Sequence, residues 1–315
     1  MRTFDGALGW IASLAGGNRI RMKRLDLAAL VAVMVGAGCA TNLSTLQTGK
    51  TLRPGQIRVA GGAGVYIPAG QVVNAIGQGV HFAKKGVEAA SNKENFEVTQ
   101  DETEKLITAA VALVVLPPST SYEVSARYGV IDNFDVGMRY GLNALRADAK
   151  VRLFHGGGPE GEGEGGRRSF DVAIGVGVSK YFFSNPVMGA LEKVKLAEFS
   201  RWDVEVPLYV SADFNPYFGL YFVPKYVYSH TTFELKLLEL AQACSCYEER
   251  LQLPAKVDMH FVGATGGLRA GLPRLSFFAE LTAGNTFVKP TIMGKPRDLG
   301  GVTLYPSIGL AGTFR

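Results

Sequence analysis

Three polar side chains near residue 230 have the residue types needed for acyl transfer. Ser229, His230 and Glu234 offer a hydroxyl, an imidazole and a carboxylate, which is the set that serine hydrolases use. The chain has only four histidines, and this order and spacing match no known motif of a barrel hydrolase. We therefore predict no catalytic residues and no enzyme, and we keep a lipid-modifying hydrolase as the alternative.

Two cysteines are candidates for a disulfide. Cys244 and Cys246 are separated by one residue, so a bond between them would close a very small, strained ring. No histidine lies near them, which makes a poor zinc site. We expect a local disulfide or two free thiols, and we predict no metal and no cofactor.

The first forty residues have the pattern of an export signal. Basic residues between Arg19 and Arg24 precede an apolar run over 27–35, and small residues follow. The apolar run is too short to span a bilayer. Met22 is a better start than Met1, because a signal peptide normally begins close to its basic region.

The end of this signal, Gly36-Ala37-Gly38-Cys39, resembles the lipobox of bacterial lipoproteins. The resemblance implies cleavage after residue 38, acylation of Cys39 and a signal peptide over 1–38. Gly36 departs from the aliphatic residue usual there, and the alternative is an ordinary signal peptide with a chance cysteine. Ala40 stands where lipoproteins of the inner membrane usually carry aspartate, which favours the outer membrane.

The composition excludes several other classes of protein. The chain carries a formal net charge of +5, but its leader contributes much of the excess, and no basic stripe suggests nucleic acid. No run of eighteen uncharged apolar residues predicts a membrane-spanning helix. A hydrophobic content of 47% with 39 glycines suits a sheet with an apolar outer face and small residues inside.

Alternation with period two dominates the chain from Gln56 onward. Between 122 and 130, for example, Tyr122 and Val124 alternate with Glu123 and Ser125. The predicted strands are 56–67, 120–131, 134–143, 146–155, 169–180, 202–213, 217–229, 256–270, 274–286 and 301–314. We predict an all-β fold, an antiparallel transmembrane β-barrel of ten strands, with eight or twelve as alternatives.

The connections between the predicted strands differ in length on the two sides of the sheet. Short turns at 132–133, 215–216 and 272–273 fall on one side, together with the Gly/Glu-rich linker 156–166. Long connections at 68–119, 181–201, 230–255 and 287–300 fall on the other side, with one short turn at 143–145. Outer-membrane barrels pair short periplasmic turns with long external loops.

Two segments lie outside the strand pattern. We expect 39–55 to be a lipid-anchored linker, leaving 56–315 as the barrel. The long connection 68–119, with helix-compatible sequence over 71–90, is expected to be a partly helical loop or a plug-like insertion. The alternative is that it supplies an extra strand pair.

The final strand carries a further resemblance. Ser307, Gly309 and Phe314 match in part the terminal signal that the barrel-assembly machinery reads. Over 51–315 the chain resembles Gram-negative outer-membrane β-barrel proteins of the small, porin-like or outer-membrane-protein type. A soluble β-sandwich is the alternative fold, since it also alternates apolar and polar residues.

If the apolar face points outward, many charged residues face the lumen. Residues of both signs are present, so they can pair across a narrow interior or line a narrow channel. The predicted lumen-facing residues are Glu123, Arg127, Asp135, Arg139, Asp148, Lys150, Arg152, Asp171, Asp203, Glu205, Lys225, Asp258, His260 and Glu280.

Together these patterns predict an outer-membrane β-barrel lipoprotein with a non-enzymatic structural, adhesive or narrow-pore role. Its expected partners are outer-membrane lipid, the barrel-assembly machinery during biogenesis and a protein bound through the external loops. No nucleic-acid partner is expected. The alternatives are the hydrolase and a soluble periplasmic β-sandwich lipoprotein.

Overall fold

The computed structural model describes residues 41–70, 73, 77, 118–141, 144–157, 168–182, 197–235, 256–272, 274–292 and 295–314. Outside these residues lie the leader, Cys39, Cys244, Cys246, most of 68–119 and the part 158–166 of the Gly/Glu-rich linker. Within the described part of the chain, no helix is long and apolar enough to cross a membrane.

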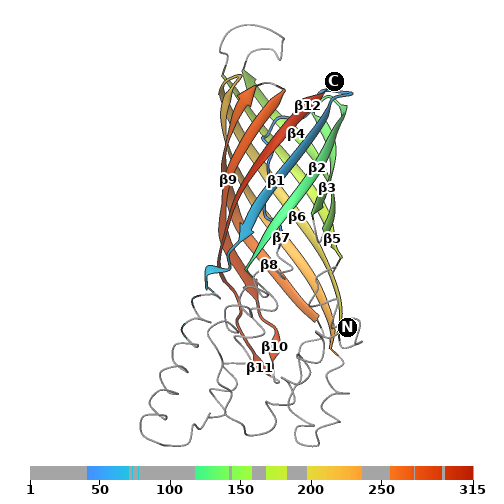
Figure 1. Cartoon of the computed structure of the whole chain (residues 1–315), viewed down its shortest axis with the longest axis vertical. Coiled ribbons are helices and arrows are strands. Elements are labelled where there is room, and N and C mark those ends of the chain that lie inside the picture. The colour runs from blue at the N-terminus through green and yellow to red at the C-terminus, as the bar shows by residue number, and fades with distance from the viewer. Residues whose placement is uncertain are drawn as a thin grey trace, which may run out of the picture.

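Ten antiparallel strands form one sheet that closes on itself (Figure 1). They are β1 (Ile57–Tyr66), β2 (Ser119–Ile131), β3 (Phe134–Gly141), β4 (Ala144–Gly157), β5 (Ser169–Tyr181), β6 (Ala197–Asn215), β7 (Phe218–Leu235), β8 (Lys256–Leu272), β9 (Leu275–Val288) and β12 (Gly301–Phe314). The two-residue strands β10 (Thr291–Ile292) and β11 (Lys295–Pro296) pair only with each other. The predicted ten-stranded barrel is confirmed, and the β-sandwich alternative is wrong.

The register explains both the closure and the strand count. β1 pairs with β12 on one side, where Ile57 lies opposite Phe314, and with β2 on the other, where Ile57 lies opposite Tyr128. β1 and β2 are direct neighbours in this closed sheet, so the alternative of a twelve-stranded barrel is wrong.

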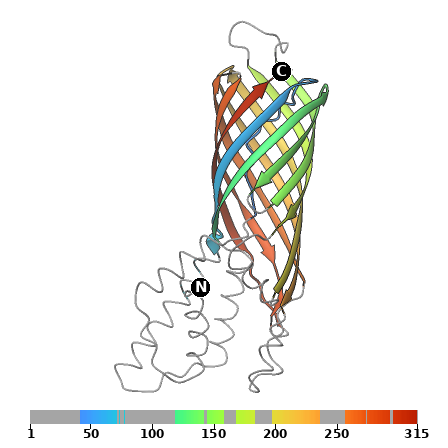
Figure 2. The ribbon, with the colours of Figure 1, turned by 45° about the vertical axis from the view of Figure 1, so that its right-hand side comes forward.

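The strands reach different heights at one end of the barrel. β6 and β7 contain 19 and 18 residues, whereas β3 contains 8. In Figures 1 and 2 the strands β6 to β9 therefore extend farther down than β2 to β4. The start of β1 and the end of β12 lie together at the opposite end, where the short turns are.

The outer face of the barrel is apolar. In β5, Ile174 and Val176 are 41% and 49% exposed, while Asp171 and Ala173 on the other face are fully buried. Aromatic pairs gather near both ends of the wall, such as Phe214 stacked on Phe218 and Trp202 edge-on to Tyr228. An apolar exterior with aromatic girdles is the architecture of outer-membrane barrels.

The inner face alternates very small and very large residues. A Cβ atom added to Gly175, Gly267 or Gly64 would lie 3.1, 2.2 or 2.5 Å from the ring of an inward-pointing tyrosine. These three rings, Tyr209, Tyr221 and Tyr305, are all buried. The many glycines therefore make room for large side chains in an interior that is filled rather than open.

Candidate functional site in the barrel lumen

A segment without regular secondary structure runs through the barrel. From Thr41 to Gly49 every residue except Asn42 is buried, although all of them precede the first strand. The segment begins near the long-loop end, where the Arg201 guanidinium donates to the Thr41 hydroxyl over 2.5 Å. It leaves at the short-turn end, where Lys50 pairs with Asp213 at 2.6 Å. We call residues 41–52 the lumen segment.

A tight turn joins the lumen segment to the wall. The Gly55 amide donates to the Gly129 carbonyl, and the Gly129 amide donates to the Gln56 carbonyl. Gly55 has a φ of 80°, a left-handed conformation that glycine adopts without steric penalty. The chain therefore passes through the lumen in one direction and returns as β1 in the other.

Carboxylates of the wall accept hydrogen bonds from the segment. Glu280 accepts from the backbone amides of Thr45, at 2.9 Å, and Leu46. Glu123 accepts from the Ser44 hydroxyl at 2.6 Å and from the Asn42 amide group. Bonds to an ionised acceptor are stronger than neutral ones, so these carboxylates hold the segment firmly.

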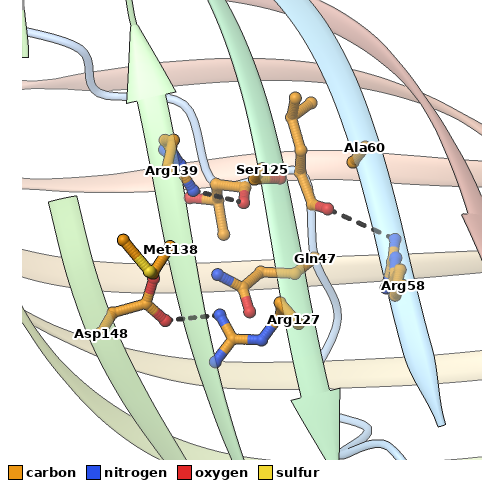
Figure 3. Close-up of a pocket in the computed structure, with 10 residues that line it drawn as sticks. Gln47, Arg58, Ala60, Ser125, Arg127, Met138, Arg139 and Asp148 are labelled. Carbon is orange, nitrogen blue, oxygen red and sulfur yellow. Dashed lines mark hydrogen bonds and ion pairs between the residues drawn. The ribbon is translucent and has the colours of Figure 1, made fainter. Parts of the chain in front are cut away.

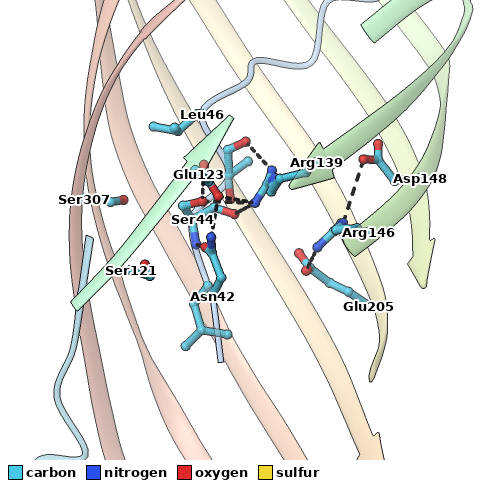
Figure 4. A network of polar contacts seen from close by, with 12 residues as sticks. Asn42, Ser44, Leu46, Ser121, Glu123, Arg139, Arg146, Asp148, Glu205 and Ser307 are labelled. Atoms are coloured by element: carbon cyan, nitrogen blue, oxygen red, sulfur yellow. Dashed lines mark hydrogen bonds and ion pairs between the residues drawn. The ribbon is translucent and has the colours of Figure 1, made fainter. Parts of the chain in front are cut away.

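Cations of the wall bind the carbonyl groups of the same segment. Arg139 donates to the carbonyls of Ser44 and Thr45 at 2.8 and 3.1 Å (Figure 4). Lys150 donates to the carbonyls of Thr48 and Lys50 at 3.1 and 2.7 Å. Lys225 donates to the Leu43 carbonyl and, over 3.0 Å, to the Thr45 hydroxyl. An irregular backbone in a buried place needs such partners.

One apolar side chain locks the segment against the sheet. Leu46 is 4% exposed and packs on two inward-facing glycines of neighbouring strands. A Cβ atom added to Gly62 or Gly309 would lie 2.4 or 2.7 Å from the Leu46 Cδ1 atom. Leu46 therefore packs in the space that is left because Gly62 and Gly309 have no side chains.

Charged residues of the wall also pair with one another in the lumen. Arg127 contacts both Asp135, at 2.7 Å, and Asp148, and Arg146 contacts Glu205. Arg139 lies 3.3 Å from Glu123, and Arg201 lies 2.9 Å from Asp203. Such pairs offset part of the desolvation penalty that each buried charge carries.

Little space is left between the segment and the wall. A cavity between Gln47, Arg58, Arg127 and Arg139 has a volume of about 10 Å³ (Figure 3). That is about the volume needed to hold one water molecule. The lumen segment and the wall therefore pack closely around this cavity.

The structure locates each predicted lumen-facing residue. Most are buried in the lumen, and the Arg152 side chain is 12% exposed and lies 3.6 Å from Asp171 at the short-turn end. Six of them contact the lumen segment directly: Glu123, Asp135, Arg139, Lys150, Lys225 and Glu280.

The prediction is wrong for Asp258 and His260, which lie on the outer face of β8: the Asp258 side chain is 54% exposed, and His260 contacts the exposed Tyr226. The reason is that β8 turns its apolar residues Val257, Met259 and Phe261 inward.

The residues predicted as an assembly signal lie in different surroundings. Ser307 is buried and donates to Glu280 over 3.0 Å, and Gly309 contacts Leu46. Phe314 is 61% exposed on the outer wall. Ser307 and Gly309 therefore also help to hold the lumen segment, whereas Phe314 does not contact it.

Sequence patterns missed two cations and the segment itself. Arg201 lies one residue before the strand predicted at 202–213, and Arg146 begins the strand predicted at 146–155 on its polar face. The alternation therefore offered a signal for both. Residues 41–50 have no period and only one charge, so nothing distinguished them from a surface linker.

The proposed serine–histidine pair does not form. Neighbouring residues of a strand point to opposite faces; Ser229 is fully buried in the lumen and lies 3.1 Å from Arg201. The His230 ring lies on the outer wall, 2.7 Å from Asp258 and beside Trp202. The strand therefore separates the two side chains that the alternative of a hydrolase would need together.

Comparisons with known proteins add the following. No family model and no curated protein sequence matches the chain. The crystal structure of the outer membrane protease OmpT from Escherichia coli is similar over 85% of this chain and 100% of that chain, with 10% identity and a TM-score of 0.32. A likeness this distant identifies neither a family nor an activity.

Proposed function

We propose that this protein is a non-enzymatic outer-membrane β-barrel lipoprotein that acts as a closed scaffold rather than as a pore. Its external loops are then the surface through which it meets partners, and acylation of Cys39 anchors it. The observation that carries the proposal is the lumen segment, which fills the barrel and is bonded to wall residues of both signs.

The energetics favour the closed state. Withdrawing the segment would leave Glu280 without its two amide donors and Lys150 without its two carbonyl acceptors. A hydrogen bond to a charged group contributes about 1.5–3 kcal/mol, and about 5.5 kcal/mol moves an equilibrium from 1:99 to 99:1. A few of these bonds are therefore enough to make an open lumen rare.

Conductance across a planar bilayer tests this proposal. The full mature chain should show no steady conductance, and a variant lacking 41–52 should conduct if it folds, which heat-modifiable gel mobility checks. A conducting full-length protein would contradict the closed scaffold.

A reversible crosslink provides the matched control. The hydroxyls of Thr45 and Thr265 lie 3.4 Å apart, so Thr45→Cys with Thr265→Cys should form a disulfide between segment and wall. Cys244 and Cys246 are replaced by serine in this variant. We expect ready crosslinking and equal, negligible conductance before and after reduction. Conductance that appears only on reduction would show that the segment leaves the lumen and that the barrel is a gated pore.

A further inference from the structure

The path of the lumen segment has a consequence for the membrane anchor. Resting on the proposed function, we infer that the mature chain begins at the outer face of the outer membrane, with the acyl chains of Cys39 in the outer leaflet. The barrel is then a lipoprotein anchored from the cell surface, and its N-terminus crosses the membrane through its own lumen.

The orientation of the barrel is the first step. The short connections β2–β3, β6–β7 and β8–β9 lie at one end, and those after β1, β5, β7 and β9 are long and lie at the other. Single-chain barrels place short turns in the periplasm and long loops outside. The last strand also ends at the short-turn end, at Phe314. Since Thr41 lies toward the long-loop end, the segment enters the lumen from outside.

The depth of Thr41 is the second step. Its partner Arg201 precedes Trp202, which belongs to the aromatic cluster of the outer wall near the long-loop end. Phe214, in the aromatic pair near the other end, follows twelve residues later in the same strand. A strand rises about 3.3 Å per residue and is tilted by about 40°, so these rings lie about 30 Å apart along the barrel axis. Thr41 is therefore level with the outer membrane interface.

At the long-loop end, the barrel wall is shortest beside the segment. Gly141, the last residue of β3, lies opposite Glu123, and Ala144 at the start of β4 lies opposite Gly141. Glu123 is the residue that holds Asn42 and Ser44. The wall at β3 and β4 thus ends close to the level at which the segment enters, whereas β6 and β7 continue farther.

The length of chain before Thr41 decides which leaflet the anchor can reach. Cys39 is two residues upstream, and two residues span at most about 7 Å. Cys39 must therefore lie within that distance of Thr41, at the long-loop end of the lumen, where the outer leaflet is the nearer one. To reach the periplasmic leaflet the chain would have to return through a lumen that the segment already fills.

Anchoring at this end also explains how the segment is retained. The acyl chains would hold it from outside, and the turn at Gly55 joins it covalently to β1 at the other end. An extended segment that is held covalently at both ends of the lumen cannot slide out. The lipid anchor and the turn at Gly55 therefore keep the lumen segment in place together.

An epitope tag inserted between Ala40 and Thr41 tests the inference, because Ala40 stays next to the cysteine. Matched controls carry the tag in the linker after Gly161, on the short-turn side, or after Cys246, on the long-loop side. Antibody on intact cells should bind the N-terminal and long-loop tags, and should bind the linker tag only after permeabilisation. Detection of the N-terminal tag only after permeabilisation, with the long-loop tag exposed, would overturn the inference.

A smaller insertion covers the case in which the tag prevents folding. One cysteine between Ala40 and Thr41, in a chain with serine at 244 and 246, should react with a membrane-impermeant maleimide on intact cells, and lack of reaction in the folded protein would contradict the inference. Failure of the proposed function gives different results: without a barrel the long-loop tag is hidden as well, and without acylation at Cys39 the labelled protein carries no lipid.

Discussion

The wall and the lumen segment satisfy their backbone groups in opposite ways. Each wall strand bonds to its two neighbours along continuous ladders, as β1 does with β12 and β2. The lumen segment has no neighbouring strand, and its amides and carbonyls bind charged side chains such as Glu280 and Arg139. The wall therefore depends on a repeating pattern, whereas the segment depends on a few individual residues.

This difference predicts different responses to mutation. An exposed position of the wall tolerates many residues, provided that its face stays apolar. A residue that holds the segment tolerates few substitutions, because its hydrogen-bonding groups and its position are both specific. The following predictions test that contrast, from the largest expected effect to the smallest.

Arginine on either face of β5 should have the largest effect. Ile174→Arg places a charge on the lipid face, which costs about 2–4 kcal/mol near the midplane. Ala173 is fully buried beside Tyr209 in the filled interior, so Ala173→Arg should reduce the folded fraction at least as much. Heat-modifiable gel mobility measures both. A well-folded Ala173→Arg variant would contradict the filled interior.

Glu280→Ala should destabilise the barrel by several kcal/mol. This carboxylate accepts from the Thr45 and Leu46 amides and from the hydroxyls of Tyr221 and Ser307. An orphaned buried donor costs about 1–3 kcal/mol. Glu280→Gln keeps one acceptor oxygen and should lose less. Urea unfolding in detergent measures the change in unfolding free energy, and equal stability of Glu280→Ala and the parent would exclude this role.

Gly309→Val should loosen the segment with a moderate loss of stability. The valine side chain would occupy the space that Leu46 fills, since its Cβ atom alone would lie 2.7 Å from Leu46 Cδ1. We expect conductance across a planar bilayer to rise. Adding Leu46→Ala to this variant should recover part of the stability, because space returns at the same point. If Gly309→Val stays closed and fully stable, Leu46 is not a lock.

Cys39→Ser should remove the lipid and leave the fold intact. Incorporation of labelled palmitate should be lost, while heat-modifiable mobility should not change, because residues 41–52 still fill the lumen. Persistent labelling would show that another residue is acylated. Loss of folding would show that the anchor is needed to place the segment.

Replacing both Ser229 and His230 by alanine should have the smallest effect. The two side chains lie on opposite faces of β7 and share no contact, so the lipid profile of cells carrying this variant should match that of the parent, as measured by mass spectrometry. Accumulation of uncleaved lipid in the variant would revive the hydrolase.

Much of the wall was predictable from the sequence because its structure repeats. Alternation in segments such as 169–180 places apolar residues on one face and charged or small residues on the other, and ten such segments predict ten strands. Short turns, such as the one at Asp132 and Asn133, set the antiparallel order. These signals are local, and pairing of neighbouring strands needs no further information.

The lumen segment was decided by the tertiary structure alone. Residues 41–50 have no alternation and no helical period, and their partners are as distant in sequence as Lys225 and Glu280. Only closure of the barrel brings these charges around one axis, where an unpaired charge is costly and an extended backbone supplies the missing donors and acceptors. The sequence thus determined that charged residues would line the lumen, and the closed barrel determined that the chain's own N-terminal segment would pair with them.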